Sequence, residues 1–273
     1  LPVVLVPGLL AAGIGSLVSI GIGSFTGLSS SAYALGTLSL PAFTRPDAVQ
    51  FAWTIALAAA VAVVARLVMR GGLTTYRIVS RQLVVALPIV GLLVAALAIG
   101  FSEATGRSVN EVLFSGQDAL PGLAAHAGSW SISALVLLIG FKGAAYSLSL
   151  GSFRGGPTFP ALFLGAAAGI IASHLPGFAL TPAVAVGMGA ATAAVLRLPL
   201  SAVVLATLLT AKDGVGDEPL IIVGVAVAYL VTLFMTAKAP AVSQDREPAR
   251  SEDGASAAVG QPGAGGGSLR EAS

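Results

Sequence analysis

Long apolar runs separated by short polar segments dominate the chain. Runs of about 20 residues are long enough to cross the hydrocarbon core of a bilayer as helices. Five runs meet this test, at residues 2–25, 51–68, 82–101, 131–150 and 220–237. The pattern predicts an all-α protein, a polytopic transmembrane helical bundle that spans a membrane several times.

Three further apolar runs are shorter, and Gly or Pro bounds or interrupts them, at residues 159–173, 182–196 and 200–211. Backbone that stops being helical at membrane depth needs partners inside the protein, because lipid offers none. In transporters such broken helices often point their ends at the substrate. Residues 151–210 are therefore the first place to look for a functional site, although a kink that only serves packing has the same texture.

The charged residues between the runs predict an orientation. Residues 66–81 carry Arg66, Arg70, Arg77 and Arg81 and no acid. We expect them to form a cytoplasmic loop, because cytoplasmic segments are enriched in Lys and Arg. Residues 102–129 and 212–218 are net acidic and fit the opposite side. The last predicted span then returns the chain to the cytoplasm.

The distribution of apolar and polar residues divides the chain into two regions. Residues 1–237 form the predicted membrane region of a multi-pass cell-membrane protein. Residues 238–273 are rich in Ala, Gly, Ser, Pro and charges, so we expect a disordered cytoplasmic tail. The chain begins with an apolar run at Leu1 that has no basic segment before it, and we expect the natural protein to start further upstream.

Composition supports lipid as the surroundings. Of 273 residues, 56% are hydrophobic and only 10% are charged, whereas soluble domains carry about 25% charged residues. The net charge of +2 is too small and too scattered to suggest a nucleic-acid partner, and no cysteine is present. Two isolated histidines do not predict a metal site, and the sequence predicts no cofactor.

The stretch Gly155-Gly156-Pro157-Thr158-Phe159-Pro160 precedes one of the short apolar runs. Pro suits the first turn of a helix, and glycines before it let the backbone approach a ligand. The free N–H groups of a first turn carry the positive end of the helix dipole, so this is a candidate anion site without a fixed cation. A plain helix start remains the competing interpretation.

Two segments resemble the CLC family of chloride channels and chloride/proton exchangers. Residues 156–162 look like a variant of its Gly-x-Phe-x-Pro signature. Residues 187–201, Gly-Met-Gly-Ala followed by Arg-Leu-Pro-Leu-Ser, match a second and more specific family pattern. The resemblance is strong from residue 148 to 210 and covers roughly residues 1–237. It implies one half of a CLC-type inverted repeat, in a homodimer whose subunits each carry an anion pathway.

The resemblance also implies roles for single residues. Gly155, Gly156, Thr158, Phe159 and Pro160 would form one wall of the pathway, with the N–H groups of Thr158 and Phe159 as donors. Arg154 and Arg197 are candidates for pathway electrostatics, although each also fits a position at the membrane interface. Family members commonly carry a basic residue near Lys142, which implies an internal hydrogen-bonding role.

The chain departs from the family pattern at several positions. Pro157 stands where members offer a backbone N–H. Val242 stands where many members carry an anion-contacting Tyr, and no acid lies near Leu208. The first-half motifs, including the one with the gating glutamate, are missing, so channel and proton-coupled exchanger are not distinguished.

We therefore expect transport of chloride or a similar small anion, with the lipid bilayer as the other partner. A non-transporting membrane scaffold, derived from a CLC protein, is the alternative. An intramembrane serine protease is disfavoured, because neither His126 nor His174 lies within a predicted span and no Gly-x-Ser-x-Gly elbow occurs.

Overall fold

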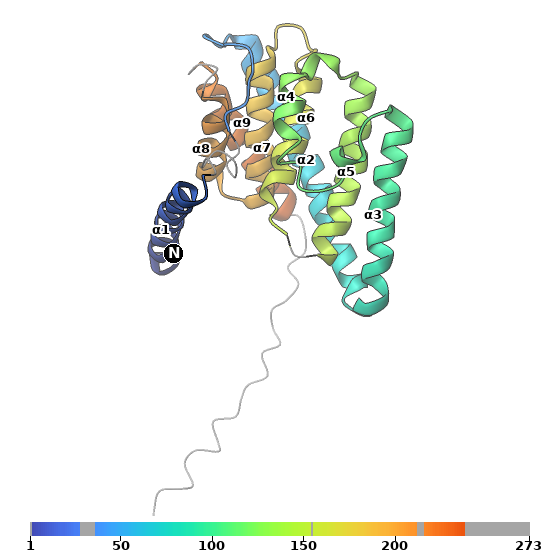
Figure 1. Ribbon diagram of the computed structural model, residues 1–273. Coiled ribbons are helices and arrows are strands. Elements are labelled where there is room, and N and C mark those ends of the chain that lie inside the picture. The colour runs from blue at the N-terminus through green and yellow to red at the C-terminus, as the bar shows by residue number, and fades with distance from the viewer. Residues whose placement is uncertain (1, 28–35, 154, 212–215, 238–273) are drawn as a thin grey trace, which may run out of the picture. The chain divides into compact units, whose positions relative to one another are not determined.

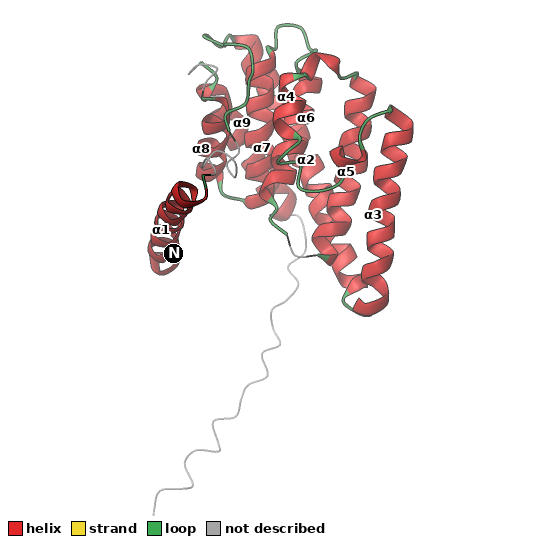
Figure 2. Ribbon diagram, in the orientation of Figure 1, coloured by secondary structure: helices red, strands yellow, loops and turns green. Residues whose placement is uncertain are grey.

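The computed structural model describes residues 2–27, 36–153, 155–211 and 216–237. The described chain is helical and contains no strand, as predicted (Figures 1 and 2). In chain order its α-helices are α1 (Pro2–Thr26), α2 (Ala48–Val79), α3 (Leu83–Thr105), α4 (Leu120–Ala125), α5 (Ile132–Ser152), α6 (Thr158–Ala172), α7 (Leu180–Leu196), α8 (Pro199–Thr210) and α9 (Glu218–Ala237). The 3-10 helices η2 (Val109–Glu111) and η3 (Ala127–Ser129) flank α4.

Helix length separates two classes of element. Within the described residues, α1, α2, α3, α5 and α9 are long and apolar enough to cross a membrane. Helices α6, α7 and α8 have 15, 17 and 12 residues and are too short for a full crossing. The expected alternation of full spans and short helices is confirmed. The predicted tail, residues 238–273, lies outside the described residues, as do residues 212–215 of the acidic turn.

The expected cytoplasmic loop at residues 66–81 is mostly helix, because α2 continues to Val79. The prediction of a loop was therefore wrong for residues 66–79. Gly71 and Gly72 do not break the helix; a Cβ atom at either position would meet Ser147 or Leu150 of α5. The two glycines therefore let α5 cross α2 closely, and this packing overrides their low helix propensity.

The short helices α6 and α7 form the most closely packed pair in the bundle. Gly165 and Gly169 of α6 face Gly187 and Ala183 of α7 so closely that an added Cβ would collide with backbone carbonyl groups. Nearly all of α7 is buried. Small residues at this spacing allow two backbones to touch, which is how helices associate tightly where lipid supplies no hydrophobic driving force.

A connecting segment between α3 and α4 packs onto the start of this core. Gly106 ends α3 in the left-handed conformation (φ 68°), and the chain then runs through η2. Val112 and Leu120 are buried in the same cluster as Phe163 of α6 and Leu138 of α5. The segment therefore covers one side of α5 and α6 near the beginning of α6.

Candidate functional site

The first turn of α6 offers fewer backbone donors than an ordinary helix start. Pro157 is its N-cap residue, and the first intrahelical bond runs from the Ala161 N–H to the Pro157 carbonyl at 3.4 Å. Pro160 has no N–H. The N–H groups of Thr158 and Phe159 therefore remain without a backbone acceptor among the described residues, at the positive end of the helix dipole.

Gly155 and Gly156 precede this turn, and their backbone is accessible from outside the protein. Both are exposed, and a Cβ atom at either position would have no neighbour within 4 Å. The glycines are thus not needed for packing inside the described chain. An approaching ligand can reach their peptide groups without meeting a side chain. Arg154, which precedes them, lies outside the described residues.

Tyr146 of α5 fixes the position of the turn. Its hydroxyl donates a hydrogen bond of 3.2 Å to the Pro157 carbonyl, and its side chain is buried. The Pro157 oxygen therefore accepts two hydrogen bonds, one from Tyr146 and one from Ala161. This contact ties the start of α6 to the middle of α5.

A groove of about 260 Å³ runs along α5 and reaches the candidate residues. Gly155, Gly156 and Pro160 line it, whereas Thr158 and Phe159 do not. The α5 residues on its wall recur three and four positions apart, so they share one helix face. They are Lys142, Ala145, Tyr146, Ser149 and Leu150, and Phe153, the C-cap residue directly after α5, also lines the groove. Residues 112–115, between α3 and α4, also line the groove.

Lys142 lines the groove and is almost completely buried, with 1% of its surface exposed. Its ammonium group donates to the Glu111 carbonyl at 2.6 Å and to the Leu113 carbonyl at 3.4 Å. It also lies 4.3 Å from the ring centroid of Phe163. The internal hydrogen-bonding role expected for Lys142 is confirmed, and its acceptors belong to the segment before α4.

The structure places Arg197 away from this groove. Arg197 ends α7 with φ 57° in the left-handed conformation, and its Nη2 lies 3.4 Å from the Thr236 hydroxyl of α9. It is exposed and does not line the cavity that contains Gly155 and Gly156. Its charge acts on Arg66 of α2, together with the charge of Arg70. Arg197 thus contacts α9 near the C-terminal end of α7 and forms a basic cluster with Arg66 and Arg70 of α2.

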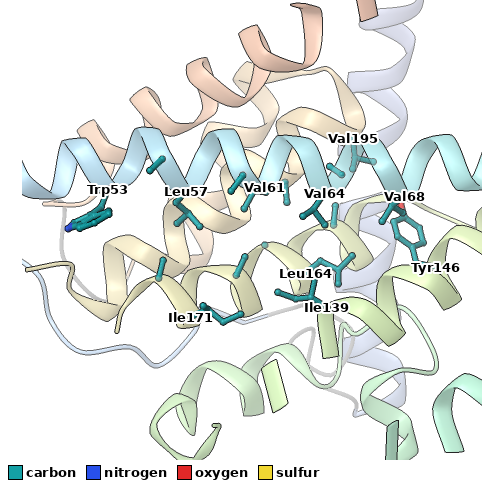
Figure 3. A pocket seen from close by; sticks show the side chains of 18 of the residues that line it. Trp53, Leu57, Val61, Val64, Val68, Ile139, Tyr146, Leu164, Ile171 and Val195 are labelled. Atoms are coloured by element: carbon teal, nitrogen blue, oxygen red, sulfur yellow. The ribbon is translucent and has the colours of Figure 1, made fainter. Parts of the chain in front are cut away.

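A larger cavity of about 350 Å³ lies between α2, α6 and α7 (Figure 3). Its walls are almost entirely apolar, and the labelled α2 side chains Leu57, Val61 and Val64 point toward α6 in Figure 3. The polar atoms at its two ends are already bonded, because Trp53 donates to the Pro176 carbonyl and Tyr146 to Pro157. It offers an anion no donor, so the polar groove is the better candidate site.

Sequence reasoning missed Tyr146 and Glu111 as site residues. Tyr146 follows Lys142 by four positions inside a predicted span, so the two share a helix face. That spacing was the available signal. No comparable signal marked Glu111, whose closeness to Lys142 depends on the path of the chain between α3 and α4. The described residues contain no group of three or more His, Asp or Glu side chains that could hold a metal ion.

Comparison with known proteins identifies the family. No match was found among curated proteins or among solved structures. A sequence model of the family described as "Voltage gated chloride channel" (Voltage_CLC) matches residues 2–233, which is most of the chain. The match includes the motif segments, the short helices α6 to α8 and the groove along α5. The chain therefore belongs to the CLC family of voltage-gated chloride channels.

Proposed function

We propose that this protein carries chloride or a similar small anion across the membrane, and that the start of α6 forms part of the pathway. Anion transport is the activity of the family at large. The proposal assigns it here to Gly155, Gly156, Thr158, Phe159 and Pro160. Channel and anion/proton exchanger both fit it.

One observation carries the proposal. The free N–H groups of Thr158 and Phe159 follow directly after the open backbone of Gly155 and Gly156, and the groove along α5 reaches these two glycines. Helix N-termini of this kind bind anions through N–H groups and the helix dipole. Binding without a full opposite charge at the contact point suits transport, because the anion has to leave as well as enter.

Two prolines weaken the site compared with an ordinary helix start. Pro157 and Pro160 remove two donors, so the remaining N–H groups of this turn hold the anion alone. We expect weak, fast-exchanging binding from this turn. We take the transporting unit to be a homodimer with one pathway in each subunit, as the family resemblance implies.

The test is chloride efflux from liposomes that contain the complete protein. Gly156→Leu fills the open approach, and Thr158→Pro deletes one of the two free donors without changing charge. Both variants are expected to abolish chloride efflux. Gly140→Leu is the matched control, because Gly140 is exposed on α5 and its Cβ would meet nothing within 4 Å. Thermal unfolding in detergent establishes that each variant is folded.

Efflux from the wild-type protein that is indifferent to both substitutions would contradict the placement of the pathway at α6. Complete absence of efflux from folded wild-type protein would favour the non-transporting scaffold instead. The two missing donors at Pro157 and Pro160 are the observation that keeps this second candidate in view.

A further inference from the structure

Three arginines come together at the end of the bundle where α7 and α9 end. Arg66 and Arg70 are four residues apart on α2, so they share one helix face. Arg197 directly follows α7, and its Nη2 lies 3.4 Å from the hydroxyl of Thr236 in the last turn of α9. The positive charges of Arg70 and Arg197 both act on Arg66. Arg66, Arg70 and Arg197 thus form an arginine cluster.

No side chain in the described part of the protein balances the charge of the arginine cluster. Arg66 is partly buried, and its Nε is shielded from solvent without a hydrogen-bond partner. The Arg70 side chain forms no ion pair or hydrogen bond with the described chain, and that of Arg197 bonds only to the neutral Thr236 hydroxyl. The carbonyl ends of α7 and α9 carry only partial negative charge. Because burying an unpaired charge is costly, the cluster favours a partner with a full negative charge.

The acids of the described chain lie in other parts of the bundle. Asp217 and Glu218 stand at the start of α9, whereas Thr236 stands near its end. The remaining described acids lie before α2, near the end of α3 or between α3 and α4, and they are Asp47, Glu103, Glu111 and Asp118. A counter-charge for the arginine cluster therefore comes from outside the described residues.

The positions of Arg66 and Arg70 along α2 match the boundary of a bilayer. At the rise of an α-helix they lie about 27 Å and about 33 Å from Ala48, the first residue of α2. The hydrocarbon core is about 30 Å thick, and the lipid headgroups lie just beyond it. With Ala48 at one boundary of the core, Arg66 and Arg70 bracket the other. Residues 66–81 contain arginines and no acid, so this is the predicted cytoplasmic side.

We propose that the arginine cluster binds the phosphate of an anionic phospholipid from the cytoplasmic leaflet. Such a phosphate carries a full negative charge and several acceptor oxygens, and guanidinium groups bind it through paired N–H donors. Arg66 and Arg70 hold the phosphate from α2, and Arg197 holds it from the end of α7. The bound lipid thereby ties α2 to α7. None of the three arginines lines the groove along α5, so the inference does not depend on the proposed function.

The first test measures the thermal unfolding midpoint of the complete protein in detergent micelles that contain increasing amounts of phosphatidylglycerol. A ligand that binds only the folded protein raises this midpoint. The wild-type midpoint is expected to rise with phosphatidylglycerol, to rise less with phosphatidylcholine of the same chain length, and to stay constant with inorganic phosphate.

The double variant Arg66→Gln/Arg70→Gln removes two of the three charges. It is expected to need at least about tenfold more phosphatidylglycerol for the same rise in midpoint, because charge-assisted hydrogen bonds are lost. Arg77→Gln/Arg81→Gln is the matched control, since it removes the same charge from the same predicted side of the membrane at two exposed positions. The control is expected to respond to phosphatidylglycerol as the wild type does.

The second test keeps Arg66 in place, so it decides the matter if the double variant does not fold. Arg70 is exposed, and Arg70→Glu puts a carboxylate four residues after Arg66 on the same helix face. There the carboxylate pairs with the Arg66 guanidinium in place of the lipid phosphate. Arg70→Glu is expected to respond equally to phosphatidylglycerol and phosphatidylcholine. Arg81→Glu reverses a charge on the same predicted side of the membrane and is expected to keep the wild-type preference.

An equal loss of response in Arg66→Gln/Arg70→Gln and Arg77→Gln/Arg81→Gln overturns the lipid site, because the lipid then responds only to the overall charge of this face. Equal wild-type midpoints with phosphatidylglycerol and phosphatidylcholine overturn it as well, as does a wild-type preference that survives in Arg70→Glu. A rise with inorganic phosphate as large as that with phosphatidylglycerol replaces the lipid by a free anion. A double variant that loses the same stability with and without phosphatidylglycerol shows instead that the partner of the arginine cluster belongs to the protein.

Discussion

At the scale of single residues, Glu111 combines burial with two nearby positive charges. Burial raises the pKa of its carboxyl, and the charges of Lys142 and Arg107 oppose that rise without cancelling it. The native state therefore binds this proton more readily than the unfolded chain does. The contribution of Glu111 to stability is fully present below the ordinary carboxyl pKa and is lost as pH rises through the raised value.

Glu111→Gln should therefore stabilise the protein at neutral pH and lose this advantage in acid. The amide keeps the shape of the side chain but carries no charge at any pH. Thermal unfolding midpoints in detergent, compared in acidic and neutral buffers, measure the difference between variant and wild type. Glu103→Gln is the control, because Glu103 is exposed on α3. A difference that does not change with pH would show that the charge of Glu111 is not responsible.

Tyr146→Phe tests the contact that positions the start of α6. It removes only the hydroxyl that donates to the Pro157 carbonyl, and that carbonyl keeps its bond from the Ala161 N–H. The expected loss is about 0.5–1.5 kcal/mol in the free energy of unfolding, together with reduced chloride flux. Tyr76→Phe is the match, since the exposed Tyr76 hydroxyl has no hydrogen bond to the described chain. Equal effects of both substitutions would show that the Tyr146 hydroxyl does not position the start of α6.

The candidate site was only partly predictable from sequence. Gly155 to Pro160 stood out because Gly-Gly-Pro before an apolar run predicts a helix start, and the structure places α6 there. The partners of that helix start come from α5 and from the segment before α4, which are distant in sequence. No local pattern in the chain specifies that Tyr146 reaches Pro157 or that Lys142 reaches Glu111 and Leu113.

At the scale of elements, helix existence followed from hydrophobic run length, whereas helix ends depended on packing. The short helices α6, α7 and α8 begin and end close to the predicted limits, because Pro and Gly punctuate them. The end of α2 was missed, since Gly71 and Gly72 resemble a break. They are tolerated because α5 lies against them, and only the folded structure supplies that neighbour.

The contact between α6 and α7 gives a direct test of this packing. Gly165→Ala adds one methyl group that would collide with the carbonyl of Gly187 and approach the Ala191 side chain. We expect a loss of about 1–3 kcal/mol in the free energy of unfolding, as for other overpacked interiors. Gly140→Ala adds the same methyl group to α5 in open space and should be neutral or slightly stabilising. Equal stability of both variants would show that α6 and α7 do not meet through Gly165.

At the scale of the whole molecule, fold class could be predicted because lipid imposes such a narrow choice of structure. A chain with 56% hydrophobic residues and repeated runs of spanning length has to satisfy its backbone as helices. That α5, α6 and the segment before α4 line a common groove could be learned only from the structure. The orientation of the helices across the bilayer is predicted here from the charged residues alone.

The distribution of charge predicts which end of α3 faces the cytoplasm. Arg77 and Arg81 flank the turn before α3, whereas Glu103 and Glu111 lie at its far end. Helix α3 has 23 residues, about 35 Å, so its two ends lie on opposite sides of a hydrocarbon core about 30 Å thick. The positive-inside rule then places the turn at Ser80 in the cytoplasm and the segment at Asn110 outside.

Single cysteines test this arrangement cleanly, because the chain contains none of its own. Ser80→Cys and Asn110→Cys place a thiol at two exposed positions on opposite sides of α3. In sealed vesicles of known orientation, a membrane-impermeant maleimide should label Ser80→Cys from the cytoplasmic side and Asn110→Cys from the outside. Labelling of both from one side would mean that α3 does not cross the membrane. The reverse pattern would keep the span but invert the topology predicted from the charges.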